Sequence, residues 1–599
     1  MKTMKHQTLY SLWALVALLA CSSCSDFLDV EPEEALLKEQ MYRNVFDADA
    51  AVIGVYGKLL SLAEQHVVLN ELRADLLTVT NRANPYLQEI NTNDVGAISA
   101  DNPYINPRKF YEVILNCNDV LANFKVMRDN NILAPEEYDQ RYSDVMAVRS
   151  WVYLQLGIHF GRVPYVTDPL EHADDVLDES KYPMMEFEQL LSHLIADMEA
   201  IPYKGIYGAE EALMLSVDGY QMERFFINKQ ALLGDLHLWN NDYRQAAENY
   251  KLVMTAYDNL GNDGYRFDRY KIRWSDVVNN NDISVGYLRY RTQDVRTLIN
   301  SKTQGWRSMF SRTQDVLWHT EWVWALPFDS DFSPGNPFIN LFSASAGDHL
   351  LKPSQQSLSL WDSQTQLNGV PYDARRDLSM SVPAALDGSA PDGGLMGMAL
   401  DGVVTKYTDE FSDIQTMLPI NDFERNGKWH LYRAAKLHLR FAEAANREGH
   451  HKLAAALLNN GLGTAYDNPD QSYKTDIMQT HLPFPYDFDA RNGNNPHYRA
   501  TWHRHAGIRG RAYVTNREIS SADSLMQIED YLIEEAALEM AFEGSRWEDL
   551  LRIAMRRNDP AFLADKVYDK LSKEGSPAAE AVRNKLMQRE NWFLPFDWE

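Results

Sequence analysis

Cysteine is scarce in this chain. The 599 residues include three cysteines, Cys21, Cys24 and Cys117, and two of these lie close to the N-terminus. A disulfide needs two thiols, so none can form within residues 25–599. Cys117 lies on a face with helical periodicity, and we interpret it as a small core residue.

Basic residues are few relative to acidic ones. Lys and Arg total 58 against 85 Asp and Glu, which gives a formal net charge of -27. So acidic a chain is repelled by nucleic acid and by anionic membrane surfaces, and we therefore expect no nucleic-acid partner. Hydrophobic residues make up 45% of the chain and aromatic residues 11%, which indicates a globular protein.

Catalytic and metal-binding motifs are missing. The chain has no Gly-x-Ser-x-Gly elbow, His-Glu-x-x-His helix or Walker loop, and Gly393–Gly397 is no dinucleotide fingerprint. His503 and His505 lack a third ligand at a diagnostic spacing, and Asp387–Gly402 lacks the register of a calcium loop. We predict no metal, no cofactor and no enzymatic activity. A glycoside hydrolase stays open as an alternative, because it needs only two carboxylates.

Long apolar runs are absent after the leader. Lys2 and Lys5 precede an apolar stretch, Leu9–Leu19, which is too short to span a membrane. Leu18 to Cys21 then resembles the bacterial lipobox, in which the cysteine becomes the acylated N-terminus. We predict a signal peptide over residues 1–20, lipidation in the 21–24 region at Cys21 or Cys24, and a tether over 25–40. An ordinary secretory leader is the alternative.

Two stretches carry the pattern of paired helices. Residues 228–254 and 440–462 each place small residues twelve positions apart, Gly234 with Ala246 and Ala442 with Ala454, so that two helices can approach closely. This is the tetratricopeptide pattern, and one such pair must bury its apolar face against others. Helical periodicity also covers 109–124, 138–160 and 528–554. We predict a mostly α fold, an irregular helical-repeat scaffold with loop-rich insertions and a few short strands; a non-repeat bundle is the alternative.

Residues 78–107 are rich in Asn, Asp and Pro and show little periodicity. Irregular segments of this length are usually functional or disordered. Flat rings and amide groups suit polar, ring-shaped ligands, and a plain surface loop is the alternative. The candidate ligand-binding residues here are Arg82, Tyr86, Asn102 and Tyr104.

The region 257–426 is the variable part. It contains one expected strand, 321–326, in which we assign Trp322 and Trp324 to the core. Trp306 and Trp318 lie in polar stretches without core periodicity, so we treat them as candidates for stacking on a sugar ring. Trp361 and Trp502 are the next candidates.

Four blocks of residues form a pattern that spans nearly the whole chain: an N-terminal block after Cys24, a helix with its exit turn, a stretch of the second helix pair, and a block near the C-terminus. They are Asp26–Asp29, Arg149, Trp151, Tyr153, Leu156, Phe160, Gly161, Val163, Pro164, Phe441–Ala444, Glu539, Glu543, Gly544, Arg546, Trp547, Asp549 and Leu550. In these residues the chain resembles the SusD/RagB family of nutrient-binding outer-membrane lipoproteins. Ala536 departs from the pattern, since the family commonly has Arg there.

The resemblance implies a protein anchored in the outer membrane by its N-terminal lipid alone and exposed at the cell surface. It implies one domain over 41–599, with a scaffold at about 41–256 and 427–599 and a ligand-binding insertion between them. The implied function is capture of an oligosaccharide and its delivery to a SusC-like TonB-dependent transporter, for which the protein acts as a lid. A peptide ligand, a surface glycoside hydrolase and a structural adaptor without a small ligand are the alternatives.

Overall fold

The computed structural model describes residues 41–596 with gaps, the longest being 256–309, 311–320, 382–401, 408–426 and 467–481. Trp306, Trp318, His503 and the leader with Cys21 and Cys24 lie outside the described residues. Helices dominate what is described, as the mostly α prediction requires. The longer helices are α2 (Val45–Leu60), α5 (Arg108–Asp129), α6 (Pro135–Phe160), α7 (Phe187–Ala200), α8 (Lys229–Trp239), α9 (Tyr243–Thr255), α13 (Gln355–Asp362), α15 (Ala434–Arg447), α16 (His451–Leu458), α20 (Ser524–Glu539), α21 (Arg546–Arg557), α22 (Pro560–Lys573) and α23 (Ala579–Leu586).

Antiparallel helix pairs build the scaffold. The pairs α5 with α6, α8 with α9 and α15 with α16 pack against one another, and α15 also packs on α9 and α20. Gly234 explains the closeness of α8 and α9, because a Cβ there would lie 2.6 Å from the ring of Tyr250. The Tyr250 hydroxyl donates to Asp235 at 2.7 Å. Both paired-helix predictions are therefore confirmed.

Short elements connect the helices. They are α3 (Ala63–Val67), a π-helical turn (Val68–Leu72), α4 (Pro85–Thr92), the 3-10 turns Val95–Ala97, Ala173–Leu177 and Arg589–Trp592, and the short helices α12 (Phe338–Phe342), α14 (Arg375–Ser379), α17 (Gly461–Tyr466) and α19 (Ile508–Arg511). The prediction of an irregular chain over 78–107 was wrong for α4. Asn84 caps this helix through the Leu87 amide at 2.9 Å, and Pro85 occupies its first position, so residues typical of loops instead start a helix.

Within the described residues, the strands form six two-stranded antiparallel ribbons. Their members are β1 (Leu77–Val79) with β7 (Leu351–Pro353), β2 (Arg162–Pro164) with β3 (Met184–Glu186), β4 (Ser216–Val217) with β5 (Tyr220–Gln221), β6 (Trp322–Phe328) with β10 (Gly427–Arg433), β8 (Met380–Ser381) with β9 (Val403–Val404), and β11 (Asn492–Asn494) with β12 (His497–Arg499).

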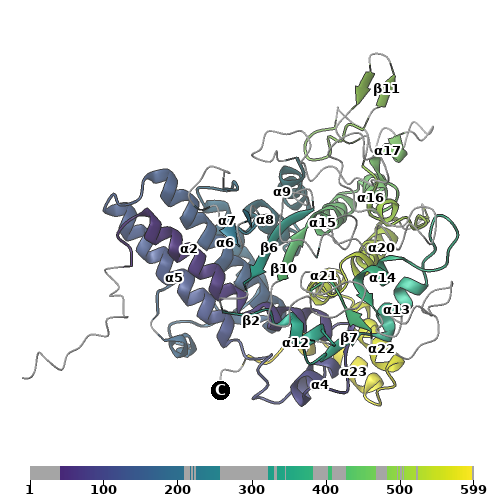
Figure 1. Cartoon of the computed structure of the whole chain (residues 1–599), viewed down its shortest axis with the longest axis horizontal. Coiled ribbons are helices and arrows are strands. Elements are labelled where there is room, and N and C mark those ends of the chain that lie inside the picture. Colours follow the sequence, from purple (N-terminus) through teal and green to yellow (C-terminus); the bar gives the residue numbers. More distant parts are fainter. Residues whose placement is uncertain are drawn as a thin grey trace, which may run out of the picture.

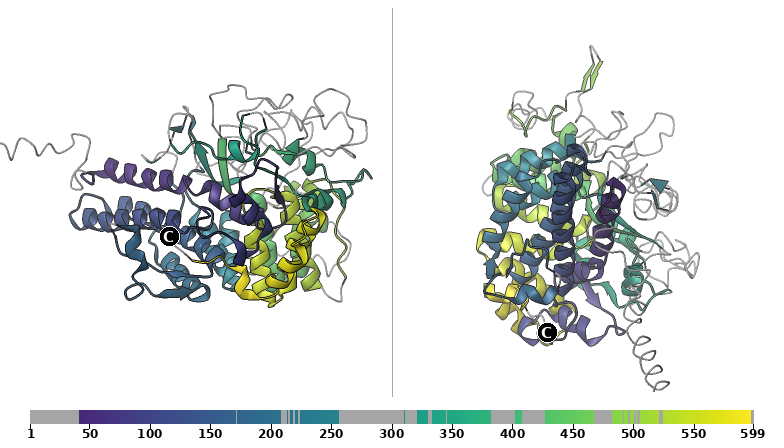
Figure 2. Two further views of the ribbon diagram at one scale, coloured as in Figure 1. Left: turned by 90° about the horizontal axis from the view of Figure 1, so that it is seen from below. Right: turned by 90° about the vertical axis from the view of Figure 1, so that its left-hand side faces the viewer.

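The ribbon of β6 and β10 joins the variable part to the scaffold. β6 covers the expected strand 321–326 except for Glu321, and β10 runs directly into α15. Trp322 and Trp324 are buried, as predicted, and the Trp324 indole N–H donates to the Phe225 carbonyl at 3.1 Å. In Figure 2 (left), the teal and green strands lie along one side of the layer of blue and yellow helices. The molecule therefore has a helical side and a side made of short strands and connections (Figure 1).

Candidate functional site

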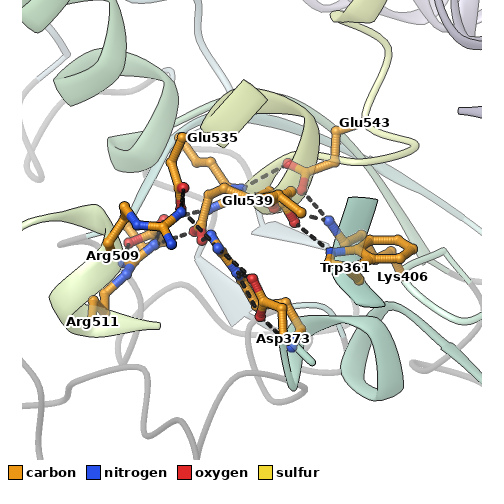
Figure 3. Close-up of polar contacts among 12 residues, drawn as sticks. Trp361, Asp373, Lys406, Arg509, Arg511, Glu535, Glu539 and Glu543 are labelled. Atoms are coloured by element: carbon orange, nitrogen blue, oxygen red, sulfur yellow. Dashed lines mark hydrogen bonds and ion pairs between the residues drawn. The ribbon is translucent and has the colours of Figure 1, made fainter. Parts of the chain in front are cut away.

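A buried ion-pair network fixes the side that carries the short strands (Figure 3). Among the described residues it has five cations and five anions, all nearly inaccessible to solvent. Its members are Arg375, Lys406, Arg433, Arg509, Arg511, Glu321, Asp373, Glu535, Glu539 and Glu543. Four of the ten, Glu321, Asp373, Arg375 and Lys406, come from the variable part, so the network ties that part to the scaffold.

Arg433 holds the centre of this network. It contacts Glu321 at 2.9 Å, Glu539 at 2.9 Å and Glu543 at 2.7 Å. Burial alone would raise the pKa of Glu543, but Arg433 and Lys406 outweigh it and lower that pKa to about 2. Each buried charge therefore keeps an opposite partner, which a buried ion needs in order to be tolerated.

A second buried cluster joins the two ends of the chain. The Glu71 carboxylate accepts the backbone N–H groups of Gly544 at 2.8 Å and Ser545 at 3.0 Å. Burial raises the pKa of Glu71 to about 7. Beside it, the Arg546 guanidinium contacts Asp75 at 2.6 Å. The motif residues Gly544 and Arg546 near the C-terminus therefore stabilise the fold.

The candidate residues of segment 78–107 divide into a surface pair and a buried pair. Arg82 is exposed and Tyr86 is half-buried, whereas Asn102 and Tyr104 are buried. The Asn102 side-chain amide donates to the Tyr86 carbonyl at 3.0 Å, and the Tyr104 hydroxyl donates to Glu64 at 2.7 Å. In this structure Asn102 and Tyr104 therefore hold the segment in place.

Tyr86 and Asp101 form a polar and aromatic pair at the surface. The Tyr86 hydroxyl donates to the Asp101 carboxylate at 2.7 Å, and Asp101 is exposed. The pKa of Tyr86 is raised by this hydrogen bond and by the Asp101 charge. A ring with a fixed hydroxyl beside an accepting carboxylate is suited to stacking and hydrogen bonding with a sugar. The ligand-binding role of all six candidates stays a prediction.

Strand β1 brings the segment against the variable part. Leu77 to Val79 pair with Leu351 to Pro353, and the Thr80 hydroxyl donates to the His349 carbonyl at 2.6 Å. The two parts of the chain that the sequence selects for ligand binding are thus adjacent. Nothing local in the sequence indicates this pairing, because about 270 residues separate the two strands.

The next tryptophan candidates do not offer a face to a ligand. Trp361 and Trp502 are 1% and 3% exposed. The Trp361 indole donates to the Leu538 carbonyl at 3.2 Å (Figure 3), and Trp502 packs edge-on against Phe488 at 4.6 Å between ring centres. Both fill the core in this structure.

The described part of the chain contains no group of three or more His, Cys, Asp or Glu side chains that could hold a metal ion. His438 and His505 approach to 3.1 Å, and His505 also accepts the Leu462 amide, so the pair serves packing within the core. None of the described helices is long and apolar enough to cross a membrane. Cys117 is buried, in agreement with its assignment to the core.

The known proteins that resemble this chain are named as SusD-like or SusD superfamily proteins. No family model matches the chain. The SusD-like protein P38 of Formosa agariphila is 24% identical over 262 residues, which cover 43% of this chain and 46% of that protein. The match thus spans a little under half of the relative's length.

Solved structures match over most of the chain. A SusD superfamily protein from Bacteroides vulgatus gives a TM-score of 0.57 at 12% identity, covering 93% of this chain and 96% of that one. A SusD-like carbohydrate binding protein from Bacteroides fragilis gives 0.52 at 15%, covering 87% and 88%. A laminarin binding SusD-like protein gives 0.51 at 14%, covering 93% and 96%. The structure thus has the fold that the resemblance in the sequence implies, that of the SusD-like proteins.

Proposed function

We propose that this protein binds a glycan at the cell surface, on the side built from segment 78–107 and the variable part. The observation that carries the proposal is the pairing of β1 with β7, which joins the two stretches that have ligand-binding character. The buried network of Figure 3 supports the proposal, because a rigid core beneath a binding surface keeps that surface preorganised for its ligand.

The chemistry of the surface pair agrees with a carbohydrate ligand. Tyr86 offers one face of its ring, and Asp101 accepts hydrogen bonds from neighbouring hydroxyls. Arg82 is exposed four residues before Tyr86 and adds a donor. Two proteins of similar fold are named for carbohydrate or laminarin binding. We propose the same class of ligand for this chain. Trp306 and Trp318 would supply further rings for stacking.

The buried carboxylates favour a protein that binds glycan without cleaving it. Glu71 has a pKa raised to about 7, as a general acid often has, but it is fully buried and accepts backbone N–H groups. The buried acids Glu539 and Glu543 are held by arginines. These groups therefore have structural tasks. The alternatives are a peptide ligand on the same surface and a surface glycoside hydrolase.

Anchoring and transport complete the proposal. A lipid on Cys21 or Cys24 would hold the protein in the outer membrane, with residues 25–40 as its tether. The helical side would then contact a SusC-like TonB-dependent transporter, and the protein would act as a lid that opens to bind glycan and closes to release it into the barrel.

A soluble protein of residues 25–599 tests binding and catalysis together. We expect a glycan array, with laminarin among its probes, to identify a ligand that retards the protein in an affinity gel. We also expect no new reducing ends after prolonged incubation with that ligand. A ligand that is cleaved would establish the hydrolase alternative, and retention by peptides alone would establish the peptide alternative.

A further inference from the structure

A cleft of about 970 Å³ lies where the chain ends. It is surrounded by the C-terminal residues 589–596, the end of α6 with the ribbon of β2 and β3, residues 176–179 and the start of α7, together with Val95. Figure 2 shows the marked C-terminus among the helices, below the strands in its left view. The volume is at the upper end of the range for ligand sites in proteins. No step of the proposed glycan binding uses this cleft.

The C-terminal segment is held in a fixed position along the cleft. The Leu594 amide donates to the His159 carbonyl at 2.8 Å. Phe593 lies over Gly161, where a Cβ would come within 2.7 Å of the ring and the positive φ of 75° favours glycine. Phe596 packs edge-on against Phe160 with 5.9 Å between ring centres. The half-buried rings of Phe593 and Phe596 therefore give the cleft a rigid aromatic floor.

The ribbon of β2 and β3 forms one wall. Arg162 lies opposite Glu186 and Pro164 opposite Met184, and all four line the cleft. Val163 between them is fully buried on the other face, as the alternation of side chains along a strand requires. Within the described residues β3 pairs with β2 alone, so the other edge of β3 has no strand beside it.

The rim of the cleft is acidic. Four carboxylates and two guanidinium groups line it, which gives a net charge of -2: Glu179, Glu186, Glu188, Glu590, Arg162 and Arg589. Glu188 pairs with Arg589 across the cleft. No ion pair with another described residue engages Glu179, Glu186 or Glu590. Leu177, on the same rim, is 43% exposed.

We propose that this cleft docks an extended, basic segment of a partner protein, with one apolar side chain against Phe593, Phe596 and Leu177. The aromatic floor provides burial for that side chain. The unpaired carboxylates attract Lys or Arg on either side of it, and the edge of β3 can pair with an extended backbone. Val95 of segment 78–107 also lines the cleft, but none of the residues proposed to bind glycan does, so the proposal does not depend on glycan binding.

Fluorescence anisotropy with a short labelled peptide tests the docking site on soluble protein of residues 25–599. The peptide has lysines around one leucine and one phenylalanine. We expect it to bind, and we expect Glu179→Lys with Glu186→Lys to weaken binding by about tenfold or more, since each change replaces attraction by repulsion. Leu177→Ser should weaken it as well by removing an apolar contact, although this exposed side chain contributes little to folding.

The control separates the cleft from the general acidity of the chain. Glu518→Lys with Glu580→Lys changes the net charge by the same amount at exposed positions elsewhere, and binding should stay within about twofold of wild type. A peptide with serine in place of leucine and phenylalanine should bind about tenfold more weakly. Equal losses in the two charge-reversal proteins, or no loss in either, would overturn the proposal. Glycan binding should be unchanged in all variants, so failure of one proposal is distinguishable from failure of the other.

Discussion

Arg433 connects carboxylates from different parts of the chain within the buried ion-pair network. Its guanidinium contacts three carboxylates that come from two parts of the chain, Glu321 before β6 and Glu539 and Glu543 at the end of α20. Burial of ions is costly, and a well-packed apolar replacement of the whole network can be equally stable. Removing one partner is different, because the carboxylates then remain buried without a cation.

The variant Arg433→Met should therefore destabilise the fold by about 3 to 5 kcal/mol. Urea unfolding followed by circular dichroism measures this. Arg43→Met is the matched control, because Arg43 pairs with Asp47 at the surface and is 61% exposed; its effect should stay within about 0.5 kcal/mol. Equal stability of the two variants would show that the network does not hold the variable part.

Lys570 gives a pH dependence with a definite sign. Its ammonium is fully buried and donates to the Leu72 carbonyl at 2.6 Å, and burial lowers its pKa from 10.5 to about 7. Between these values the unfolded chain binds more protons than the folded one. The Lys570 contribution to stability therefore rises with pH from about 7 to 10.5.

The comparison of wild type with Lys570→Met isolates this contribution. The wild-type free energy of unfolding minus that of the variant should increase by up to about 1.4 kcal/mol per pH unit between pH 8 and 10. Urea titrations at several pH values give this difference. Parallel pH profiles for the two proteins would mean that Lys570 keeps an ordinary pKa.

At the scale of elements, local patterns predicted the helices well. The small residues that bring helices together, such as Gly234, act over one helix pair, so their spacing is visible in the sequence. Helix α4 was missed because Asn84 and Pro85 were interpreted as loop residues, although they are also an N-cap and a first helical residue.

The pairing of distant elements could not be predicted in the same way. Arg433 and Glu321 are 112 residues apart, and no local signal connects them. For the site, Arg82 and Tyr86 were proposed from composition and stay predictions, whereas the contact of Tyr86 with Asp101 and the burial of Asn102 depend on the folded segment. The cleft at the C-terminus was missed, although Phe593 and Phe596 beyond the last helix are a signal for it.

Gly234→Leu tests the close helix pair. A Cβ at this position already falls 2.6 Å from the Tyr250 ring, so the larger side chain should cost about 1 to 3 kcal/mol. Gly57→Leu on α2 is the matched control, because no atom lies within 4 Å of its Cβ position. It should leave stability unchanged or raise it by up to about 1 kcal/mol. Both are measured by thermal and urea unfolding, and an unchanged midpoint for Gly234→Leu would refute the overpacking argument.

The whole molecule has two sides with different composition. The helical side consists of paired helices that pack on one another, and the described part of the other side consists of two-stranded ribbons and short helices (Figures 1 and 2). Connections carry ligand-binding residues more often than the scaffold that supports them. In the function proposed above, the predicted N-terminal tether would present this molecule at a membrane.

We expect the lipid anchor to be attached to Cys21. Because the lipid needs one particular thiol, Cys21→Ala should leave the protein without lipid, and mass spectrometry of the N-terminal peptide gives the site directly. Cys24→Ala is the control and should still be acylated. An acylated Cys24 at the N-terminus of the wild-type protein would move the anchor by three residues and reject the choice of Cys21.

Calorimetric titration of array-identified glycan into soluble protein tests the central claim most directly. Tyr86→Ala, Trp306→Ala and Trp318→Ala should each weaken binding by about 1 to 3 kcal/mol with unfolding unaltered. Tyr182→Ala is the matched control, because the Tyr182 hydroxyl donates to Asp168 at 2.9 Å in a similar surface pair that includes no residue of segment 78–107, and it should bind as wild type does. If the three site variants bind the glycan as tightly as wild type, or if the control loses as much affinity as they do, the glycan site does not lie on this side of the molecule.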